Sequence, residues 1–376
     1  MLKRLKDIAG DRVFFLIVVI LVVGGVLMFA SASLGLLARE GGEPWRLTFT
    51  QLTLGLIPGV LALIFLRYLS PKLLERAAPY AYLAAVLATL LVFVPGLGEI
   101  YNGAQRWINV GFTTVQPGEF LKIGVILMLA WYLAKMRGKL NDIRTGLIPF
   151  ALITGVPCLI LLLQPNTSTV LVLGASALAL YFLAGAPWRD ILIILALAAL
   201  AVGALVLTRP YLMQRILTFV DQSSNAQTSG YQIQQSLIAI GSGGIAGRGF
   251  GQSAQKFNYL PEAHGDSVFA VYSEEFGFLG AIILVALFAL FALRGFAIAA
   301  DGATLFAALA ATGLTLVITL SAFLNIGAML GVLPLTGLPL PFISHGGTAL
   351  LTVLASVGII LNVAAHRKAM HHPRKA

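Results

Sequence analysis

Residues 13–33, VFFLIVVILVVGGVLMFASAS, form an uninterrupted apolar run with no charged side chain. An α-helix rises 1.5 Å per residue, so about 20 apolar residues cross the ~30 Å hydrocarbon core of a bilayer. The run is too long for the core of a signal peptide. The SAS at 31–33 resembles a cleavage site, but a second spanning run follows it, so we expect a retained first helix.

Runs of this kind recur along the whole chain, which is 59% hydrophobic and 11% charged, with a mean hydropathy of +0.92. Only helices and closed barrels satisfy their backbone groups in lipid. The composition therefore predicts an all-α integral membrane protein, a single polytopic domain over residues 1–376 with about ten transmembrane helices. The expected spans are 13–33, 49–67, 78–97, 119–134, 146–163, 168–185, 190–208, 267–293, 303–331 and 343–365.

The net charge of +10 raises the alternative of a nucleic-acid partner. With the N-terminus placed inside, 17 of the 25 lysines and arginines fall in inner segments and eight in outer segments. This asymmetry is the positive-inside pattern, and it predicts that both termini are cytoplasmic. The charge is then explained by topology and no nucleic acid is expected. Residues 209–266 become a large extracellular loop between helices 7 and 8, and we expect this loop to bear the active site.

Charge is concentrated at the end of that loop, in YLPEAHGDSVFAVYSEEFG, residues 259–277. Asp266 stands just before the eighth span, where an aspartate can simply cap a helix. A cap does not require the neighbouring Glu262 and His264, whereas a general base requires a carboxylate in a site that tunes its pKa. We therefore interpret Asp266 as a candidate catalytic base, with Glu262 and His264 in supporting roles.

Other polar groups fall at the outer ends of the predicted spans, and together they suggest a polar cavity near the outer leaflet. Taken singly, the basic ones fit contacts with lipid head groups, but as a group facing one carboxylate they suggest a phosphate or pyrophosphate ligand. Ser344 can also be a helix cap, and His345 a buried polar residue with a backbone partner. The candidates are Arg106, Glu119, Lys122, Gln164, Arg215, Gln235, Arg248, Gln255, Lys256, Ser344 and His345.

Three further features have more limited interpretations. Glu274 and Glu275 lie inside the eighth span, and we expect each carboxylate to pair with a buried lysine or arginine that fastens helices together. The glycine-rich GSGGIAGRGFG (241–251) follows no βαβ strand, so it is interpreted as a flexible loop or as backbone bends against lipid. No cluster has metal-ligand spacing, although carboxylates with a bound phosphate can recruit Mg²⁺ or another divalent cation.

Several of these stretches resemble the SEDS family of peptidoglycan glycosyltransferases. The matching segments are GAQRW, QPGEFLK, QPNTST, RILTF, GYQIQQSLIAIGSGGIAGRGFGQSAQKFNYLPEAH and NIGAMLGVLPLTGLPLPFISHGG, and they extend over nearly the whole chain. GQSAQKFNYLPEAH looks more like the division branch, FtsW, than the elongation branch, RodA. The resemblance implies that the chain polymerises lipid II, a disaccharide-pentapeptide on undecaprenyl pyrophosphate, with Asp266 as the family's essential aspartate.

This chain departs from the family pattern at three places. His264, Gly265, Asp266 and Ser267 stand where the family usually has H-T-D-F. The segment 344–349, SHGGTA, replaces S-Y-G-G-S-S, and Asn166 replaces the aspartate of Q-P-D-x-G-T. The substitution at Asn166 argues against any role there that needs a carboxylate.

The resemblance also implies partners, and it leaves two other function classes open. The implied partners are a class B penicillin-binding transpeptidase and other membrane proteins of the divisome or elongasome, at the inner membrane and enriched at the septum. One alternative is a transporter that flips lipid II, against which the apolar middles of most spans argue. The other is a non-catalytic scaffold of a cell-wall synthase complex.

The topology can be tested directly. Because basic residues are concentrated on one side, tags at either terminus should be cytoplasmic, and a reporter at Ser224 should be external. Cytoplasmic labelling at Ser224 would contradict the assignment of every candidate site residue to the outer face.

Overall fold

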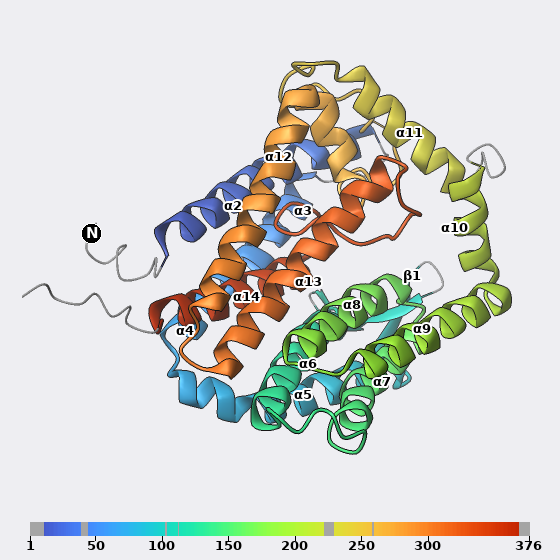
Figure 1. Ribbon diagram of the computed structural model, residues 1–376. Helices are drawn as coiled ribbons and strands as arrows, with labels where there is room; N and C mark the ends of the chain where they lie inside the picture. Colours follow the sequence, from blue (N-terminus) through green and yellow to red (C-terminus); the bar gives the residue numbers. More distant parts are fainter. Residues whose placement is uncertain are drawn as a thin grey trace, which may run out of the picture.

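The computed structural model describes residues 11–38, 44–101, 104–111, 113–221, 229–257 and 259–367, and within them the chain is a helical bundle (Figure 1). Ser224, chosen for the topology test, lies outside these residues. The helices are α2 (Arg12–Ser33), α3 (Pro44–Gln51), α4 (Ile57–Tyr68), α5 (Pro71–Leu90), α6 (Pro117–Lys135), α7 (Leu147–Leu163), α8 (Thr167–Leu183), α9 (Trp188–Thr208), α10 (Pro210–Val220), α11 (Ser229–Ser242), α12 (Val268–Ala300), α13 (Leu305–Met329) and α14 (Gly347–Ala365).

The apolar runs become spanning helices. In the described part of the chain, eight helices are long and apolar enough to cross a membrane, counting α3, the following turn and α4 as one. The two remaining expected spans correspond to α7 and α8, each 17 residues long. The prediction of an all-α polytopic membrane protein is thus confirmed.

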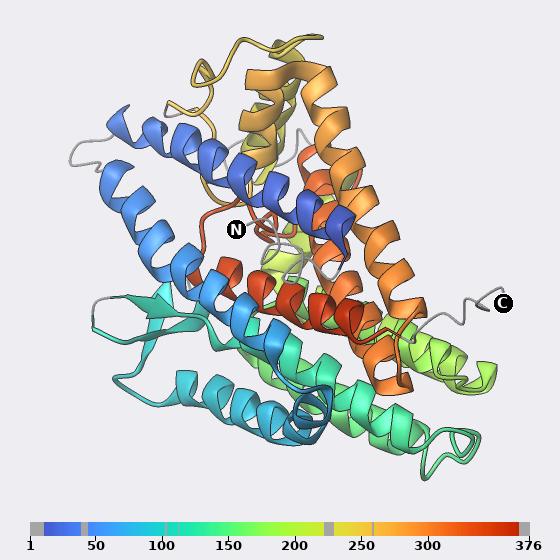
Figure 2. The ribbon, with the colours of Figure 1, turned by 90° about the vertical axis from the view of Figure 1, so that its left-hand side faces the viewer.

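The middle of the bundle is formed by α6, α13 and α14, whose side chains are largely buried. Helix α14 packs along α4, and α13 contacts α6, α8, α12 and α14. Both views place α14 between the pair α2 and α12 on one side and α5 and α6 on the other (Figure 2). Helix α9 leaves most of its apolar side chains exposed, as suits a helix that faces lipid.

The two outer segments expected to be loops contain regular structure. Residues 209–266 include α10, which begins at Pro210 in the favoured first helical position, and α11, which buries Ile233, Ser236 and Ala239 on one face. Residues 98–118 include a three-stranded antiparallel sheet of β1 (Gly98–Tyr101), β2 (Ala104–Asn109) and β3 (Thr114–Val115), in the order β1-β2-β3. With 11 and 14 residues, α10 and α11 are too short to cross the membrane.

Helix α12 is interrupted at Gly277, which has φ +66° and ψ −166°. The glycine-rich segment packs there: Phe278 N donates to Gly244 O at 2.9 Å, and Arg248 N donates to Glu274 O at 3.0 Å. A Cβ on Gly247 would lie 2.2 Å from Glu275 O, so only glycine allows this approach. The glycines are therefore neither a free loop nor lipid-facing bends; they hydrogen-bond to the backbone of the broken helix.

The two ends of the described chain meet at one end of the bundle. The carboxylate of Asp11 accepts a hydrogen bond from Phe14 N at 3.0 Å, which caps α2. The same carboxylate forms ion pairs with Arg294 of α12 at 2.8 Å and with Arg367, after α14, at 2.6 Å. The first and last spans therefore begin and end on the same side, as the charge pattern requires.

Candidate functional site

Asp266 lies half-buried just before α12, at the junction of three segments. Its Oδ1 accepts hydrogen bonds from Gln232 Nε2 at 3.0 Å and Ser267 Oγ at 3.4 Å. Its carbonyl accepts from Asn325 Nδ2 at 2.7 Å, and the same amide donates to Leu338 O at 2.7 Å. The end of α13 therefore ties the Asp266 backbone to the segment that precedes α14.

The alternative role of Asp266 as a helix cap is not what the structure has. The capping position of α12 is Ser267, and its side chain makes no capping hydrogen bond. The carboxylate of Asp266 instead meets side-chain donors from α11 and from Ser267. The carboxylate is thus held in place without accepting hydrogen bonds from the free N–H groups at the start of α12.

The surroundings of Asp266 favour its protonated form. Burial of the carboxyl raises its pKa to about 6, the nearby charge of Glu262 adds to the rise, and the Arg215 guanidinium together with the two hydrogen bonds opposes it. A carboxylate with a pKa near 6 is still mostly ionised at pH 7 and is a stronger base than an ordinary aspartate.

Two guanidinium groups, those of Arg215 and Arg106, lie close to one another, and that of Arg215 is near Asp266. Arg215, on α10, donates from Nη1 to Thr336 O at 3.3 Å. A Cβ built on Gly337 would be 3.6 Å from Arg215 Nη2 and 3.8 Å from Asp266 Oδ2, which places both groups beside this glycine. Arg106, on β2, donates from Nε to Gln164 O at 3.1 Å and from Nη2 to Pro165 O.

Arg106 and Arg215 are close enough to affect one another. Burial lowers the pKa of the Arg106 guanidinium, and the charge of Arg215 lowers it further. In the described part of the chain, no ion pair joins either guanidinium to a carboxylate. Each guanidinium is held in place by carbonyl oxygens, so two positive charges stay close together. Such a pair is suited to bind an anion with several negative charges.

The two histidines lie beside this site. His345 N donates to His264 O at 2.8 Å, and the two rings meet edge-on with centroids 5.7 Å apart. The His345 ring stacks on Phe29, also at 5.7 Å, and burial lowers its pKa to about 4, so it is neutral at pH 7. The expected backbone partner of His345 is present, although the residue is half-buried and not fully buried.

Glu262 shapes the turn that leads into Asp266. It is exposed and has φ +50°, and its carbonyl accepts from Gly265 N at 2.8 Å and from Ser267 N at 3.2 Å. A Cβ on Gly265 would lie 3.0 Å from Glu262 Oε2, so the glycine leaves room for this carboxylate. The change from threonine to glycine at this position is compatible with the turn.

Lys256 and Arg248 lie elsewhere, and this corrects the expectation that they face Asp266. The Lys256 ammonium is fully buried and contacts Glu275 Oε1 at 2.8 Å, Gly251 O at 2.9 Å and Ser31 Oγ at 3.0 Å. Arg248 forms an ion pair with Glu274 at 3.1 Å. The expected pairing with a buried base is confirmed for Glu275 and Lys256, whereas the partner of Glu274, Arg248, is 43% exposed. Both bases are residues that had been assigned to an anionic ligand.

Gln255 belongs to the same buried structure. Glu274 accepts hydrogen bonds from Ser253 Oγ at 2.5 Å, Ala254 N at 3.1 Å and Gln255 N at 3.2 Å. The backbone of Gln255 therefore helps to neutralise a carboxylate in α12. Its backbone thus contributes to the loop that precedes Asp266.

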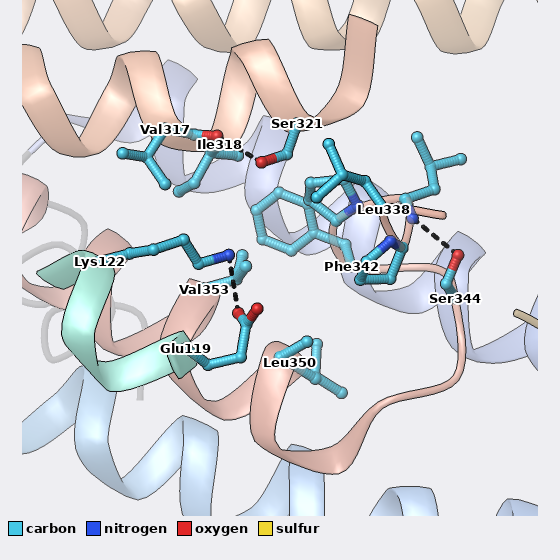
Figure 3. Close-up of a pocket in the computed structure, with 14 residues that line it drawn as sticks. Glu119, Lys122, Val317, Ile318, Ser321, Leu338, Phe342, Ser344, Leu350 and Val353 are labelled. Atoms are coloured by element: carbon cyan, nitrogen blue, oxygen red, sulfur yellow. Dashed lines mark hydrogen bonds and ion pairs between the residues drawn. The ribbon is translucent and has the colours of Figure 1, made fainter. Parts of the chain in front are cut away.

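Glu119 and Lys122 form a second polar cluster inside the bundle. Their side chains are 2.9 Å apart, and Thr352 Oγ1 donates to Glu119 Oε2 at 3.3 Å. They line a small cavity of about 30 Å³ together with Ser344 and Phe342, and Figure 3 shows the lysine turned toward the glutamate. Ser344 accepts from Leu340 N at 2.7 Å and does not cap α14, since Gly346 holds that position.

The remaining candidates support the site from outside. Gln164 is buried, donates to Thr89 O at 2.9 Å and presents its carbonyl to Arg106. Gln235 lies half-buried on α11, one turn after Gln232. Asn325 was missed by the sequence analysis, although an amide in a long apolar run was a detectable signal.

Comparison with known proteins places the chain. A family model named FTSW_RODA_SPOVE and described as "Cell cycle protein" matches residues 11–369. The chain belongs to the FtsW/RodA/SpoVE family. This confirms the SEDS resemblance that the motifs indicated.

Individual members of the FtsW/RodA/SpoVE family are similar over nearly their full length. The chain is 40% identical to a probable peptidoglycan glycosyltransferase FtsW of Alcanivorax borkumensis, with 97% of this chain and 96% of that protein covered. A structure described as structural coordination of polymerization and crosslinking by a peptidoglycan synthase complex gives a TM-score of 0.73 at 31% identity, covering 91% and 97%. The crystal structure of RodA from Thermus thermophilus gives 0.70 at 30%, covering 96% and 98%.

Replacement of Lys256 tests its structural role. Lys256→Met leaves the Glu275 carboxylate buried and unpaired, so we expect a loss of about 3–5 kcal/mol of unfolding free energy in detergent. The double variant Lys256→Met/Glu275→Met removes both charges and should recover most of the loss.

Arg248→Met provides the matched control, because Glu274 keeps its three other donors and Arg248 is 43% exposed. It should cost less than Lys256→Met. Equal and small losses for both single variants would contradict the structural role of Lys256.

Proposed function

We propose that this chain is a peptidoglycan glycosyltransferase that polymerises lipid II into glycan strands at the outer face of the cytoplasmic membrane. The observation that carries this proposal is the arrangement of Asp266, with its raised pKa, near the guanidinium of Arg215, which in turn lies close to Arg106. The names of similar proteins support it, since the Alcanivorax borkumensis relative is a probable peptidoglycan glycosyltransferase.

Asp266 is the general base in this proposal. A sugar hydroxyl of the acceptor attacks the anomeric carbon of the donor, and its proton passes to the Asp266 carboxylate as the new C–O bond forms. Gln232 and Ser267 hold one oxygen of the carboxylate and leave Oδ2 facing Gly337. Glu262 and His264 shape the turn before the base without taking the proton.

Arg106 and Arg215 stabilise the leaving group. The bond from the anomeric carbon to the pyrophosphate oxygen breaks with its electron pair on the pyrophosphate, and two guanidiniums suit that charge. Attack from the face opposite the leaving group inverts the anomeric centre, so an α-linked donor gives a β-linked glycan. Lys122, Lys256 and Arg248 are left out of this step because each is paired with a glutamate.

A divalent cation such as Mg²⁺ fits only as an ion shared with the substrate. In the part of the chain that the structure describes, no group of three or more acidic, histidine or cysteine side chains could hold a metal. Asp266 and Glu262 could offer carboxylate oxygens, with phosphate and water completing the shell, and the ion would supply further positive charge to the leaving group.

The setting proposed for the reaction is the cytoplasmic (inner) membrane, with both termini cytoplasmic and the division septum as the site of action. The relative named FtsW favours the division branch. The similar structure of a peptidoglycan synthase complex supports a class B penicillin-binding transpeptidase as partner, with other divisome or elongasome proteins beside it.

The decisive variant is Asp266→Asn. It keeps the size and hydrogen bonding of the side chain and removes its basicity. Purified Asp266→Asn should stay folded and polymerise lipid II about 10²–10⁴-fold more slowly. A normal rate of glycan synthesis would disprove the assignment. The unaltered protein tests the two alternative functions. If it moves lipid II without forming glycan, it is a flippase, and if it does neither, it is a scaffold.

The pH profile gives a second test. Only the ionised carboxylate accepts a proton, so kcat/KM should rise with pH through about 6 and fall about tenfold per unit below it. Glu262→Gln removes the neighbouring negative charge, lowers the pKa of Asp266 and should move this acid limb to lower pH. A flat profile between about pH 5 and pH 7 would contradict control by Asp266.

A further inference from the structure

Gln51, the last residue of α3, is a buried amide that binds the segment before α14 on both sides of one residue. Its Oε1 accepts from Gly346 N at 3.1 Å, and its Nε2 donates to Ser344 O at 3.3 Å. The residue between these two peptide groups is His345. One side chain thus satisfies a donor and an acceptor of a segment nearly 300 residues away in the sequence.

The backbone next to Gln51 is irregular in a way that aims this amide. A π-helical turn, Leu52–Leu56, follows it directly and leads into α4. Such turns hold one extra residue, which rotates the preceding helix by about 100° relative to the following one. Gly55 in this turn approaches Gly347 so closely that a Cβ would lie 3.0 Å from Gly347 Cα. The irregular turn and the amide therefore meet the same segment.

The clamped residue, His345, leads directly to the Asp266 segment. Its N–H donates to His264 O at 2.8 Å, and its ring stacks between Phe29 and the edge of His264. His264 precedes Asp266 by two residues, within the turn that Glu262 closes through Gly265 N and Ser267 N. A displacement of His345 would therefore shift the backbone at His264, two residues before Asp266.

We propose that Gln51 is a positioning residue: its amide fixes His345, and His345 fixes the 264–266 segment that presents Asp266. This inference rests on the proposed function for its kinetic consequence, but the mechanical link itself is a property of the fold. A general base must be held to within a fraction of an ångström of its proton, and a misplacement of 1 Å can cost about 10²-fold in rate.

Gln51→Met removes both hydrogen bonds at nearly constant volume. We expect kcat for glycan synthesis from lipid II to fall about 10- to 100-fold, with KM changed less than about twofold, because the substrate contacts remain. The acid limb of the pH profile should move to lower pH, since a loosened turn lets water reach Asp266 and lowers its pKa.

Asn362→Leu is the matched control. Asn362 is a buried amide at the opposite end of the same contact between α4 and α14, and it donates to Leu66 O, Arg67 O and Leu69 O at 2.6–3.1 Å. This variant should lower the melting temperature at least as much as Gln51→Met. It should leave kcat and the acid limb unchanged, because the hydrogen bonds of its amide end on Leu66, Arg67 and Leu69 and not on the segments that hold Asp266.

Hydrogen exchange tests the link without reference to catalysis. Gln51→Met should speed exchange of the amides at 344–346 and at 264–267, whereas Asn362→Leu should not. If Gln51→Met does not fold, Gln51→Leu replaces it, since this side chain also removes both the donation to Ser344 O and the acceptance from Gly346 N.

The outcomes separate the two proposals. Normal exchange at 264–267 in a folded Gln51 variant overturns the positioning role, as does a normal kcat where the Asp266→Asn variant is inactive. A fully active Asp266→Asn variant overturns the base assignment alone, and the exchange data then decide the clamp.

Discussion

A carboxylate inside a bilayer must be neutralised where it lies, and α12 carries two in succession. Glu274 and Glu275 meet this requirement because the chain between α11 and α12 packs against the broken helix and supplies their partners. Glu275 takes the buried ammonium of Lys256, and Glu274 takes Arg248 and three donors from residues 253–255. The break at Gly277 opens the backbone to the same segment. The position of the Asp266 turn depends on this docking, because the turn begins only a few residues later.

The site therefore separates charges by role. The pairs Lys256–Glu275 and Glu119–Lys122 are closed by short contacts between opposite charges. Asp266 has amide and hydroxyl partners, and Arg106 and Arg215 bind carbonyls. The strong ion pairs thus stabilise the fold, whereas weaker hydrogen bonds hold the residues proposed for catalysis.

Local properties of the sequence predicted most of the fold. The length of an apolar run is such a property, and each expected span corresponds to a helix. The position of Asp266 just before α12 was also predicted. The helix α10 and the sheet of residues 98–115 were missed, because each depends on what it packs against. Lys256 was misassigned for a related reason: it lies ten residues before Asp266, but its loop folds down onto Glu275. The sequence indicated a basic partner for Glu275 without indicating which base it was.

The contacts of Gln51 also determine at which stage of synthesis the site can form. The amide binds residues 293 and 295 positions later, and Asp11 contacts a residue 356 positions later. Helices enter a membrane in the order of their synthesis, from the N-terminus onward. The first spans are thus in the bilayer long before their partners are translated, and Asp266 itself is synthesised before the segment that holds its turn. The nascent protein completes the contacts around Asp266 only when the segment before α14 has been synthesised, so an unfinished chain carries Asp266 without the residues that hold its turn.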